Sequence, residues 1–458
     1  MIRKDLKTIA DMINSTLTNS SFNDILISGV CIDSRKAQKG NLFVPIKGIN
    51  ANGHNYINSA IDNGCSATLW NKNELNPPDS IGVILVDDTT LALQKLATAY
   101  RNSLDLNVIG ISGSNGKTST KDMLAALFSV RFKTQKTMGN YNNEFGVPLT
   151  ILSLDEDCEV AVVEMGLERK GDLLFLKDMV KPNIGILTNV GTAHLENFNC
   201  VEEIASAKLE IAACIEDNGL FIYNGDDKLI KGEIPKISIN KTLTVKKFGY
   251  ESDNNLYYKI IEQNENGISF ETYGELNDIF SINMLGKHQA LNALSAILAA
   301  RELNLTTDDI KKGLNNIEKT GLRNELVKIK SCTILNDSYK SNPQSTLAAL
   351  DTFETLSSPK KIAVLGDMLG LGENEAKLHY EIGTKLSGYK IDELVTCGDL
   401  AKNIAEGAKD IIKSIKIFDD KNLMIEYLSK YLDEDCMMLV KASRSLEFDE
   451  VVDKLKLK

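Results

Sequence analysis

The chain has 458 residues, of which 43% are hydrophobic and 25% are charged, and its formal net charge is −11 at pH 7. At roughly 100 to 200 residues per domain, this length predicts about three domains of an ordinary globular protein. The negative charge argues against nucleic acid or an acidic lipid surface as a partner. A phosphate-bearing ligand would therefore need a local positive site.

Cysteine spacing and hydropathy indicate the compartment. The eight cysteines are scattered, without a C-x-x-C pair or the spacing of a zinc site or disulfide framework. We therefore expect reduced thiols and a cytoplasmic protein. Charged residues interrupt the apolar positions of segment 1–17, unlike a signal peptide, and the most apolar helical stretch, 290–300, is too short to span a bilayer. We expect no membrane insertion.

Strand-like runs alternate with segments of helical period along most of the chain, a pattern typical of parallel α/β sheets. The predicted strands are 107–112, 159–163, 184–188, 361–365, 393–396 and 436–440. Polar stretches at 101–107 and 315–324 predict the domain boundaries. The expected domains are 1–104, 105–319 and 320–458.

The segment Gly-Ser-Asn-Gly-Lys-Thr at 113–118 follows an apolar strand and opens a predicted helix. In such a loop the backbone N–H groups approach phosphate oxygens, and the helix N-terminus and Lys117 add positive charge. The hydroxyl of Thr118 suits Mg²⁺. Ile111 stands where the common G-x-x-x-x-G-K-T pattern has its first glycine, which disfavours a standard GTPase or kinase loop. The alternative is a chance glycine turn.

Two polar side chains follow neighbouring strands of this predicted sheet. Glu164 ends the apolar run 160–164, and His194 comes shortly after the strand 184–188. Ligands gather at the carboxyl ends of strands in open α/β sheets, so Glu164 is a candidate Mg²⁺ ligand near the phosphate loop. The alternatives are a solvated strand end for Glu164 and a structural role for His194.

Lys208 lies on the apolar face of a predicted helix over 201–215. At 100° per residue it shares that face with Val201, Ile204, Ile211 and Ile215, whereas three glutamates lie outside it. A lysine there is costly unless it is paired, and burial depresses its pKa. Either the side chain reaches solvent or the lysine is functional.

At these motifs the chain resembles the Mur ligase family. The matched segments lie throughout the chain, at 33–35, 40–43, 53–54, 113–118, 139–148, 164–166, 189–196, 207–210, 286–294, 321–323, 337–343 and 365–379. The run Leu365-Gly-Asp-Met-Leu369 is similar to the members that add D-alanyl-D-alanine. The resemblance implies three-domain α/β architecture, with a small N-terminal α/β domain for the UDP substrate, a central P-loop-type parallel sheet domain for ATP and a C-terminal Rossmann-like domain for D-alanyl-D-alanine.

The resemblance also implies an activity. It implies an ADP-forming ligase of peptidoglycan precursor synthesis, which joins D-alanyl-D-alanine to UDP-N-acetylmuramoyl tripeptide through an acyl phosphate. ATP and Mg²⁺ would be the cofactors, and the protein would act as a monomer. The catalytic residues it implies are Lys117, His194 and Lys208.

The family's binding residues carry over to matching positions of this chain. The nucleotide contacts would be Gly113, Ser114, Asn115, Gly116, Lys117, Thr118, Ser119, Asn292, Arg323 and Asp337. The Mg²⁺ ligands would be Thr118, Glu164, His194 and Lys208, the last as a carbamate. The substrate contacts would be Ser34, Arg35, Asn142, Asn143, Tyr339 and Asn342.

Several positions depart from the family pattern, and other functions compete. Lys340 and Ser341 replace Asn-Ala in the D-S-Y-N-A-N-P loop, Gly370 stands where glutamate is common, and Ala442 replaces a glycine. The rival enzymes are the ligase that adds the third amino acid and folylpolyglutamate synthase. A rival of another class is a nucleotide-dependent switch protein, which leaves Lys208 unexplained.

Overall fold

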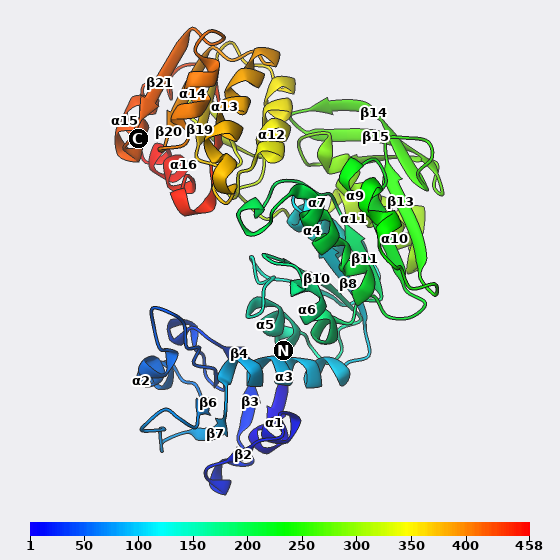
Figure 1. The fold of residues 1–458 in the computed structure, drawn as a ribbon, viewed down its shortest axis with the longest axis vertical. Helices are drawn as coiled ribbons and strands as arrows, with labels where there is room; N and C mark the ends of the chain where they lie inside the picture. Colours follow the sequence, from blue (N-terminus) through cyan, green and yellow to red (C-terminus); the bar gives the residue numbers. More distant parts are fainter.

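The computed structural model describes all 458 residues. Three sheet-based regions follow one another along the chain and form an elongated row, with the N-terminal region at one end and the C-terminal region at the other (Figure 1). The predicted boundary near 104 falls between a helix that ends at Asn102 and a strand that begins at Asn107. The boundary near 320 precedes a strand that begins at Glu325. No helix is long and apolar enough to cross a membrane.

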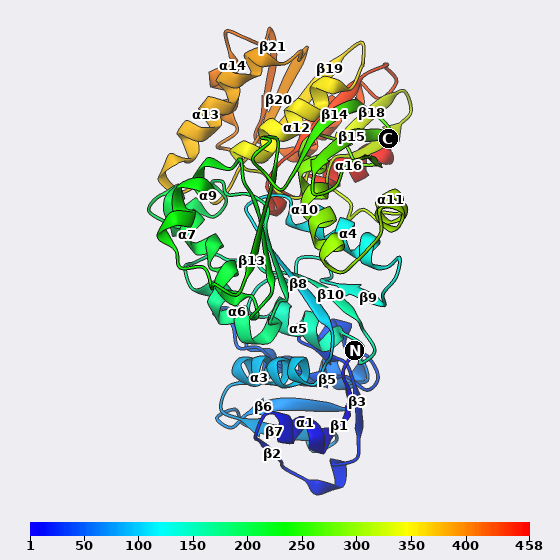
Figure 2. The same ribbon diagram turned by 90° about the vertical axis from the view of Figure 1, so that its right-hand side faces the viewer.

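The N-terminal region contains a five-stranded sheet of order β2-β7-β6-β5-β4 and a separate pair, β1-β3. Its helix α3 begins where the Asp88 carboxylate accepts a hydrogen bond from Leu91 N at 2.8 Å, which caps the helix. Tyr100 of this helix donates to the backbone oxygen of Leu154 at 2.8 Å. The helix thus lies between the first two regions (Figure 2). The elements are β1 (Arg3–Asp5), α1 (Leu6–Met12), β2 (Thr16–Leu17), β3 (Leu26–Ser28), β4 (Val30–Cys31), β5 (Leu42–Phe43), α2 (Ile57–Asp62), β6 (Ala67–Asn71), β7 (Gly82–Val86) and α3 (Thr89–Asn102).

The middle region is built on a nine-stranded sheet of order β16-β15-β14-β13-β12-β11-β8-β10-β9. Two buried apolar clusters cover its faces, one with α4 and α10 and the other with α5, α6 and α7. Its elements are β8 (Asn107–Ser112), α4 (Lys117–Phe128), β9 (Thr134–Lys136), α5 (Gly146–Ser153), β10 (Val160–Glu164), α6 (Asp172–Val180), β11 (Ile184–Leu187), α7 (Val201–Leu209), α8 (Ile211–Cys214), β12 (Leu220–Asn224), α9 (Lys228–Glu233), β13 (Thr244–Gly249), β14 (Leu256–Asn264), β15 (Gly267–Gly274), β16 (Asp278–Ile282), α10 (His288–Glu302) and α11 (Thr307–Asn315).

Two expectations for the middle region need correction. The sheet is mixed, because β14, β15 and β16 pair antiparallel; the short loop of residues 265 and 266 between β14 and β15 permits only that direction. The predicted helix over 201–215 is two helices, α7 and α8. At the break Glu210 N bonds to Ala207 O at 3.3 Å, three residues back, which tightens the last turn.

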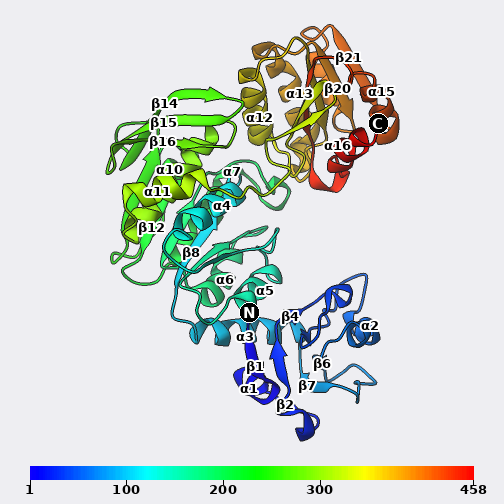
Figure 3. The ribbon, with the colours of Figure 1, turned by 180° about the vertical axis from the view of Figure 1, so that it is seen from behind.

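The C-terminal region has a six-stranded sheet of order β17-β18-β22-β19-β20-β21, in which the edge strand β17 is antiparallel to β18. Helices cover both faces, with α12 and α13 on one side of β20 and α15 and α16 on the other (Figure 3). The six strands predicted from sequence all exist, as β8, β10, β11, β19, β20 and β22. The elements are β17 (Glu325–Ile329), β18 (Cys332–Asn336), α12 (Pro343–Thr355), β19 (Lys361–Gly366), α13 (Glu375–Lys385), β20 (Glu393–Cys397), α14 (Lys402–Ala408), β21 (Ser414–Phe418), α15 (Lys421–Ser429), β22 (Met437–Lys441) and α16 (Asp449–Lys456).

Candidate active site between the middle and C-terminal domains

A cavity of about 1170 Å³ lies where the middle and C-terminal regions meet. The carboxyl ends of β8, β10 and β11 open into it from the middle region, and the loops that follow β18 and β22 line it from the C-terminal region. Because ligands of open α/β sheets bind at the carboxyl ends of strands, this cavity is the candidate active site.

The phosphate loop between β8 and α4 has a conformation that requires its glycines. Gly113 has φ of 148° and Gly116 has φ of 83°. A Cβ at Gly113 would lie 2.0 Å from Thr188 Oγ1, and one at Gly116 would lie 2.6 Å from Asn292 Oδ1. The loop therefore packs tightly and leads directly into the N-terminus of α4, which is a favourable place for phosphate.

Lys117 is the first residue of α4, and its Nζ donates to the backbone oxygen of Gly113. Burial, and then the positive charge of Lys340, lower the pKa of Lys117 to about 7. An anion bound at this loop would raise the pKa of Lys117 and so favour its charged form.

Glu164, at the end of β10, is buried and lies 3.3 Å from Nζ of Lys121, which is buried as well. Oε1 makes this contact and has no other polar partner, whereas Oε2 accepts a hydrogen bond from Asn142 Nδ2 at 3.5 Å. No group of three or more His, Cys, Asp or Glu side chains could hold a metal ion by itself. Mg²⁺ is commonly bound through one or two carboxylates together with substrate phosphates, so Glu164 and the nearby Thr118 hydroxyl fit a nucleotide-dependent Mg²⁺ site.

Lys208 and His194 line the same cavity. Lys208 is only 2% exposed on α7, and burial, followed by the charges of Lys117 and Lys340, places its pKa well below the usual value. Burial and the same two lysines, with Lys208, lower the pKa of His194 to about 3. The histidine is therefore neutral, and its Nε2 accepts a hydrogen bond from Nζ of Lys340 at 3.0 Å.

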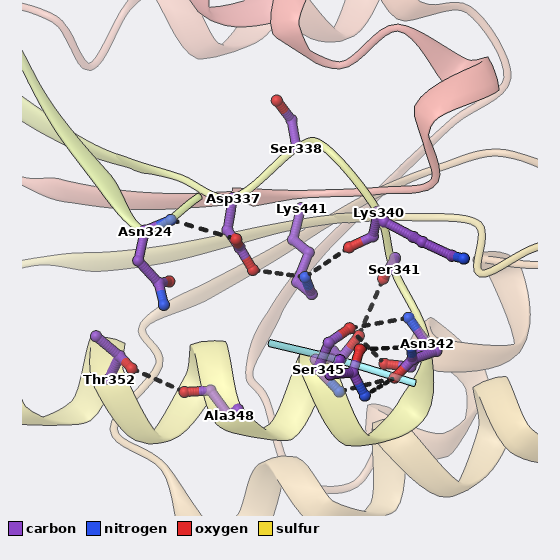
Figure 4. A network of polar contacts seen from close by, with 12 residues as sticks. Asn324, Asp337, Ser338, Lys340, Ser341, Asn342, Ser345, Ala348, Thr352 and Lys441 are labelled. Carbon is purple, nitrogen blue, oxygen red and sulfur yellow. Dashed lines mark hydrogen bonds and ion pairs between the residues drawn. The ribbon is translucent and has the colours of Figure 1, made fainter. Parts of the chain in front are cut away.

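The loop 337–343, which joins β18 to α12, brings the C-terminal region to this site (Figure 4). Lys441 Nζ pairs with the Asp337 carboxylate and donates to the backbone oxygen of Lys340 at 2.9 Å. Asn342 caps α12 and donates from Nδ2 to Oδ1 of Asn115, in the phosphate loop, at 2.9 Å. The loop is thus held both by its own domain and by the middle domain.

Most residues predicted for the site line this cavity. Arg323 and Tyr339 line it as a pair, with the guanidinium 4.1 Å from the ring centroid. The predicted residues that line the cavity are Ser114, Asn115, Gly116, Lys117, Thr118, Ser119, Asn142, Asn143, Glu164, His194, Lys208, Asn292, Arg323, Asp337, Tyr339 and Asn342.

Three predicted residues do not line it. Gly113 packs against Thr188 instead. Ser34 and Arg35 belong to the N-terminal region, where Arg35 forms an ion pair with Asp33 at 2.9 Å. Ser34 and Arg35 could contact a ligand bound in the cavity only if that ligand extended to the N-terminal region.

Two buried lysines organise the site, and sequence reasoning missed Lys121 and the partner of Lys441. Lys121 is four residues after Lys117 in α4, and Lys441 ends β22; each is only 1% exposed and each pairs with an acidic residue of the site. The sequence signal for Lys121 was its position one helical turn beyond the phosphate loop, on the helix face that packs against the sheet. The partner of Lys441 is 104 residues away, so only the fold reveals it.

Comparisons with known proteins agree with this geometry. Three family models match: "Mur ligase family, catalytic domain" at 26–101, "Mur ligase middle domain" at 111–300 and "Mur ligase, glutamate ligase domain" at 322–444. The UDP-N-acetylmuramoyl-tripeptide–D-alanyl-D-alanine ligase of Bacillus subtilis is 38% identical, and the alignment covers 99% of each chain. A crystal structure of MurF from Acinetobacter baumannii superposes with a TM-score of 0.89 at 27% identity, covering 100% of each chain.

A further solved structure includes a nucleotide. MurF ligase from Thermotoga maritima, in complex with ADP, has a TM-score of 0.80 and 27% identity, and the match covers 93% of this chain and 97% of that one. The fold and the site define a nucleotide-dependent ligase of the three-domain α/β type, and the chain belongs to the Mur ligase family. Within that family, the relatives named above are the D-alanyl-D-alanine ligases, known as MurF.

Proposed function

We propose that this chain is an ATP-dependent, ADP-forming ligase that joins D-alanyl-D-alanine to UDP-N-acetylmuramoyl tripeptide in peptidoglycan precursor synthesis. The observation that carries the proposal is the cavity in which the phosphate loop, Glu164, His194 and Lys208 meet the C-terminal loop 337–343. A phosphate-binding centre that needs two domains suits a reaction in which a phosphorylated intermediate must be shielded from water.

The reaction proceeds in two displacements. An oxygen of the tripeptide carboxylate attacks the γ-phosphorus of ATP, the bond from that phosphorus to the β-phosphate oxygen breaks, and ADP leaves. The amine of D-alanyl-D-alanine then attacks the acyl carbon, loses a proton and forms the amide, while phosphate leaves with the carboxylate oxygen. Lys117 and the N–H groups of 113–118 bind the β- and γ-phosphates and offset their charge.

Bound Mg²⁺ would offset the charge of the transferring phosphoryl group. Thr118 and Glu164 would hold one ion, and His194 and Lys208 would hold a second. Lys208 would serve as a carbamate, formed when its neutral amine bonds to CO₂ and loses a proton. Its buried position and low pKa favour the neutral amine, and an anion there would offset the charges of Lys117 and Lys340.

Each region has a separate part in this proposal. Residues 1–104, with Ser34 and Arg35, bind the UDP portion; residues 105–319 bind ATP, with Asn142 and Asn143 toward the peptide. Residues 320–458 bind D-alanyl-D-alanine, and Asp337, Arg323 and Asn292 contact the nucleotide. The eight cysteines are free, as is typical of a reduced compartment, so the proposed location is the cytoplasm, and the protein is proposed to act as a monomer.

A substrate panel tests the proposal. With ATP, Mg²⁺ and UDP-N-acetylmuramoyl tripeptide, D-alanyl-D-alanine should yield pentapeptide and one ADP and one phosphate per bond. Single amino acids and glutamate should give no product. Phosphate release without product would favour a nucleotide-dependent switch protein, and product with a single amino acid only would favour one of the rival ligases.

A further inference from the structure

Lys340 is a cation of the site that the mechanism above does not use. It lies on the loop 337–343, at a position where the family pattern has asparagine, and its exposed side chain faces the cavity. The polar partner of its ammonium is Nε2 of His194, at 3.0 Å. An imidazole offers no negative charge, so the contact satisfies a hydrogen bond but leaves the positive charge without a carboxylate partner.

The backbone of Lys340 is fixed on both sides. Nζ of Lys441 donates a hydrogen bond to the backbone oxygen of Lys340 at 2.9 Å, and the same Nζ forms an ion pair with Asp337. Two residues further on, Asn342 Nδ2 donates to Asn115 Oδ1 in the phosphate loop at 2.9 Å. In Figure 4 the Lys340 side chain extends away from Lys441. The C-terminal domain therefore presents an exposed lysine side chain beside the phosphate loop, from a loop that hydrogen bonds hold on both sides.

No carboxylate forms an ion pair with Lys340, although the charge of Glu168, in the same cavity, acts on it. Lys117 and Arg323 line the cavity as well. The carboxylates of Glu164 and Asp337 are already paired with Lys121 and Lys441. Three cations, Lys117, Arg323 and Lys340, line one cavity in a chain whose net charge is −11, which indicates a ligand with several negative charges.

We propose that Lys340 binds the terminal phosphate of ATP, as a charge that the C-terminal domain supplies across the interface. The inference rests on the proposed function and adds a residue that the family pattern does not contain. Lys117 approaches the phosphates from the middle domain, and Lys340 approaches from the facing domain. On nucleotide binding its ammonium leaves His194 Nε2, which frees that nitrogen, and moves to a γ-phosphate oxygen.

Because ADP has no γ-phosphate, the proposal predicts a difference between two affinities. Calorimetric titrations at one Mg²⁺ concentration would compare ADP with the non-hydrolysable ATP analogue that has a β,γ-imido bridge. Replacing Lys340 by the family residue, Lys340→Asn, should weaken binding of the analogue about 10- to 100-fold, the effect of losing a charged hydrogen bond. Binding of ADP should change by less than about threefold.

Matched variants separate this role from a structural one. Lys340→Arg keeps the charge and should retain most of the preference for the analogue, whereas Lys416→Asn removes an exposed lysine of β21, away from the cavity, and should change neither affinity. Equal losses for both nucleotides, or no loss for either, would overturn the proposal. If the wild-type chain shows the preference but forms no pentapeptide, the proposed function fails and the phosphate contact stands.

Discussion

The phosphate loop 113–118 and the loop 337–343 build the same site in different ways. The phosphate loop acts through its own backbone, with glycines that no other residue could replace and a helix that begins at Lys117. The loop 337–343 depends on partners far away in the chain, with Lys340 contacting His194 across 146 residues and Asn342 contacting Asn115 across 227. Local sequence therefore determines the conformation of the first loop, whereas domain docking determines the position of the second.

The largest effect should come from the phosphate loop itself. Lys117→Ala removes charge stabilisation of the transferring phosphoryl group and should lower turnover on the order of 10³-fold. The thermal midpoint of unfolding should not fall, because the removed ammonium is buried without an ion pair. Steady-state kinetics and thermal unfolding check this, with the exposed Lys241→Ala as control. An unchanged rate would mean that phosphate binds elsewhere.

Lys208→Ala should lower turnover about 10²-fold, because it removes the proposed carbamate. Short carboxylates that can occupy the vacated space should restore part of the activity. The wild-type protein, incubated with ¹³C-labelled bicarbonate, substrate and Mg²⁺, should show a carbamate ¹³C resonance that Lys208→Ala lacks. The idea fails if density shows a bare ammonium at Lys208 with substrate and Mg²⁺ bound.

Glu164 combines a structural and a functional role, which a double substitution separates. Glu164→Gln leaves Lys121 buried without its partner and should lower the free energy of unfolding by ~3 kcal/mol. Activity should fall too, with a higher Mg²⁺ requirement. Lys121→Met added to Glu164→Gln should recover most of the stability but not the activity. Recovery of both would show that Glu164 is only the partner of Lys121.

The smallest expected effect is the uptake of one proton when nucleotide binds. The pKa of Lys117 is about 7 without nucleotide because of burial, and bound phosphate raises it. At pH 8 the free lysine is mostly neutral, so ADP binding should take up close to one proton, and affinity should decrease as pH rises above 7. At pH 6 uptake should vanish. Calorimetry in buffers of different ionisation enthalpy measures this, and equal uptake in Lys117→Ala would assign the proton to another group.

Features that depend on local sequence were predictable, and features that depend on contacts between distant segments were not. The six predicted strands, the phosphate loop and the buried position of Lys208 follow from periodicity and motif, which are local properties. The antiparallel edge β14-β15-β16 was missed because these strands carry no motif, and the sheet direction depends on a short loop. The pairs Lys121–Glu164 and Lys441–Asp337 needed the fold, because helix packing and strand order bring their members together.

In the proposed reaction, ATP activates the tripeptide carboxylate within this cavity. The most direct test uses UDP-N-acetylmuramoyl tripeptide with ¹⁸O in the carboxylate that is joined to D-alanyl-D-alanine. The account predicts that, with ATP, Mg²⁺ and D-alanyl-D-alanine, each phosphate released carries one ¹⁸O from that carboxylate, because the acyl carbon loses that oxygen with the phosphate. Unlabelled phosphate, released alongside pentapeptide, would contradict it.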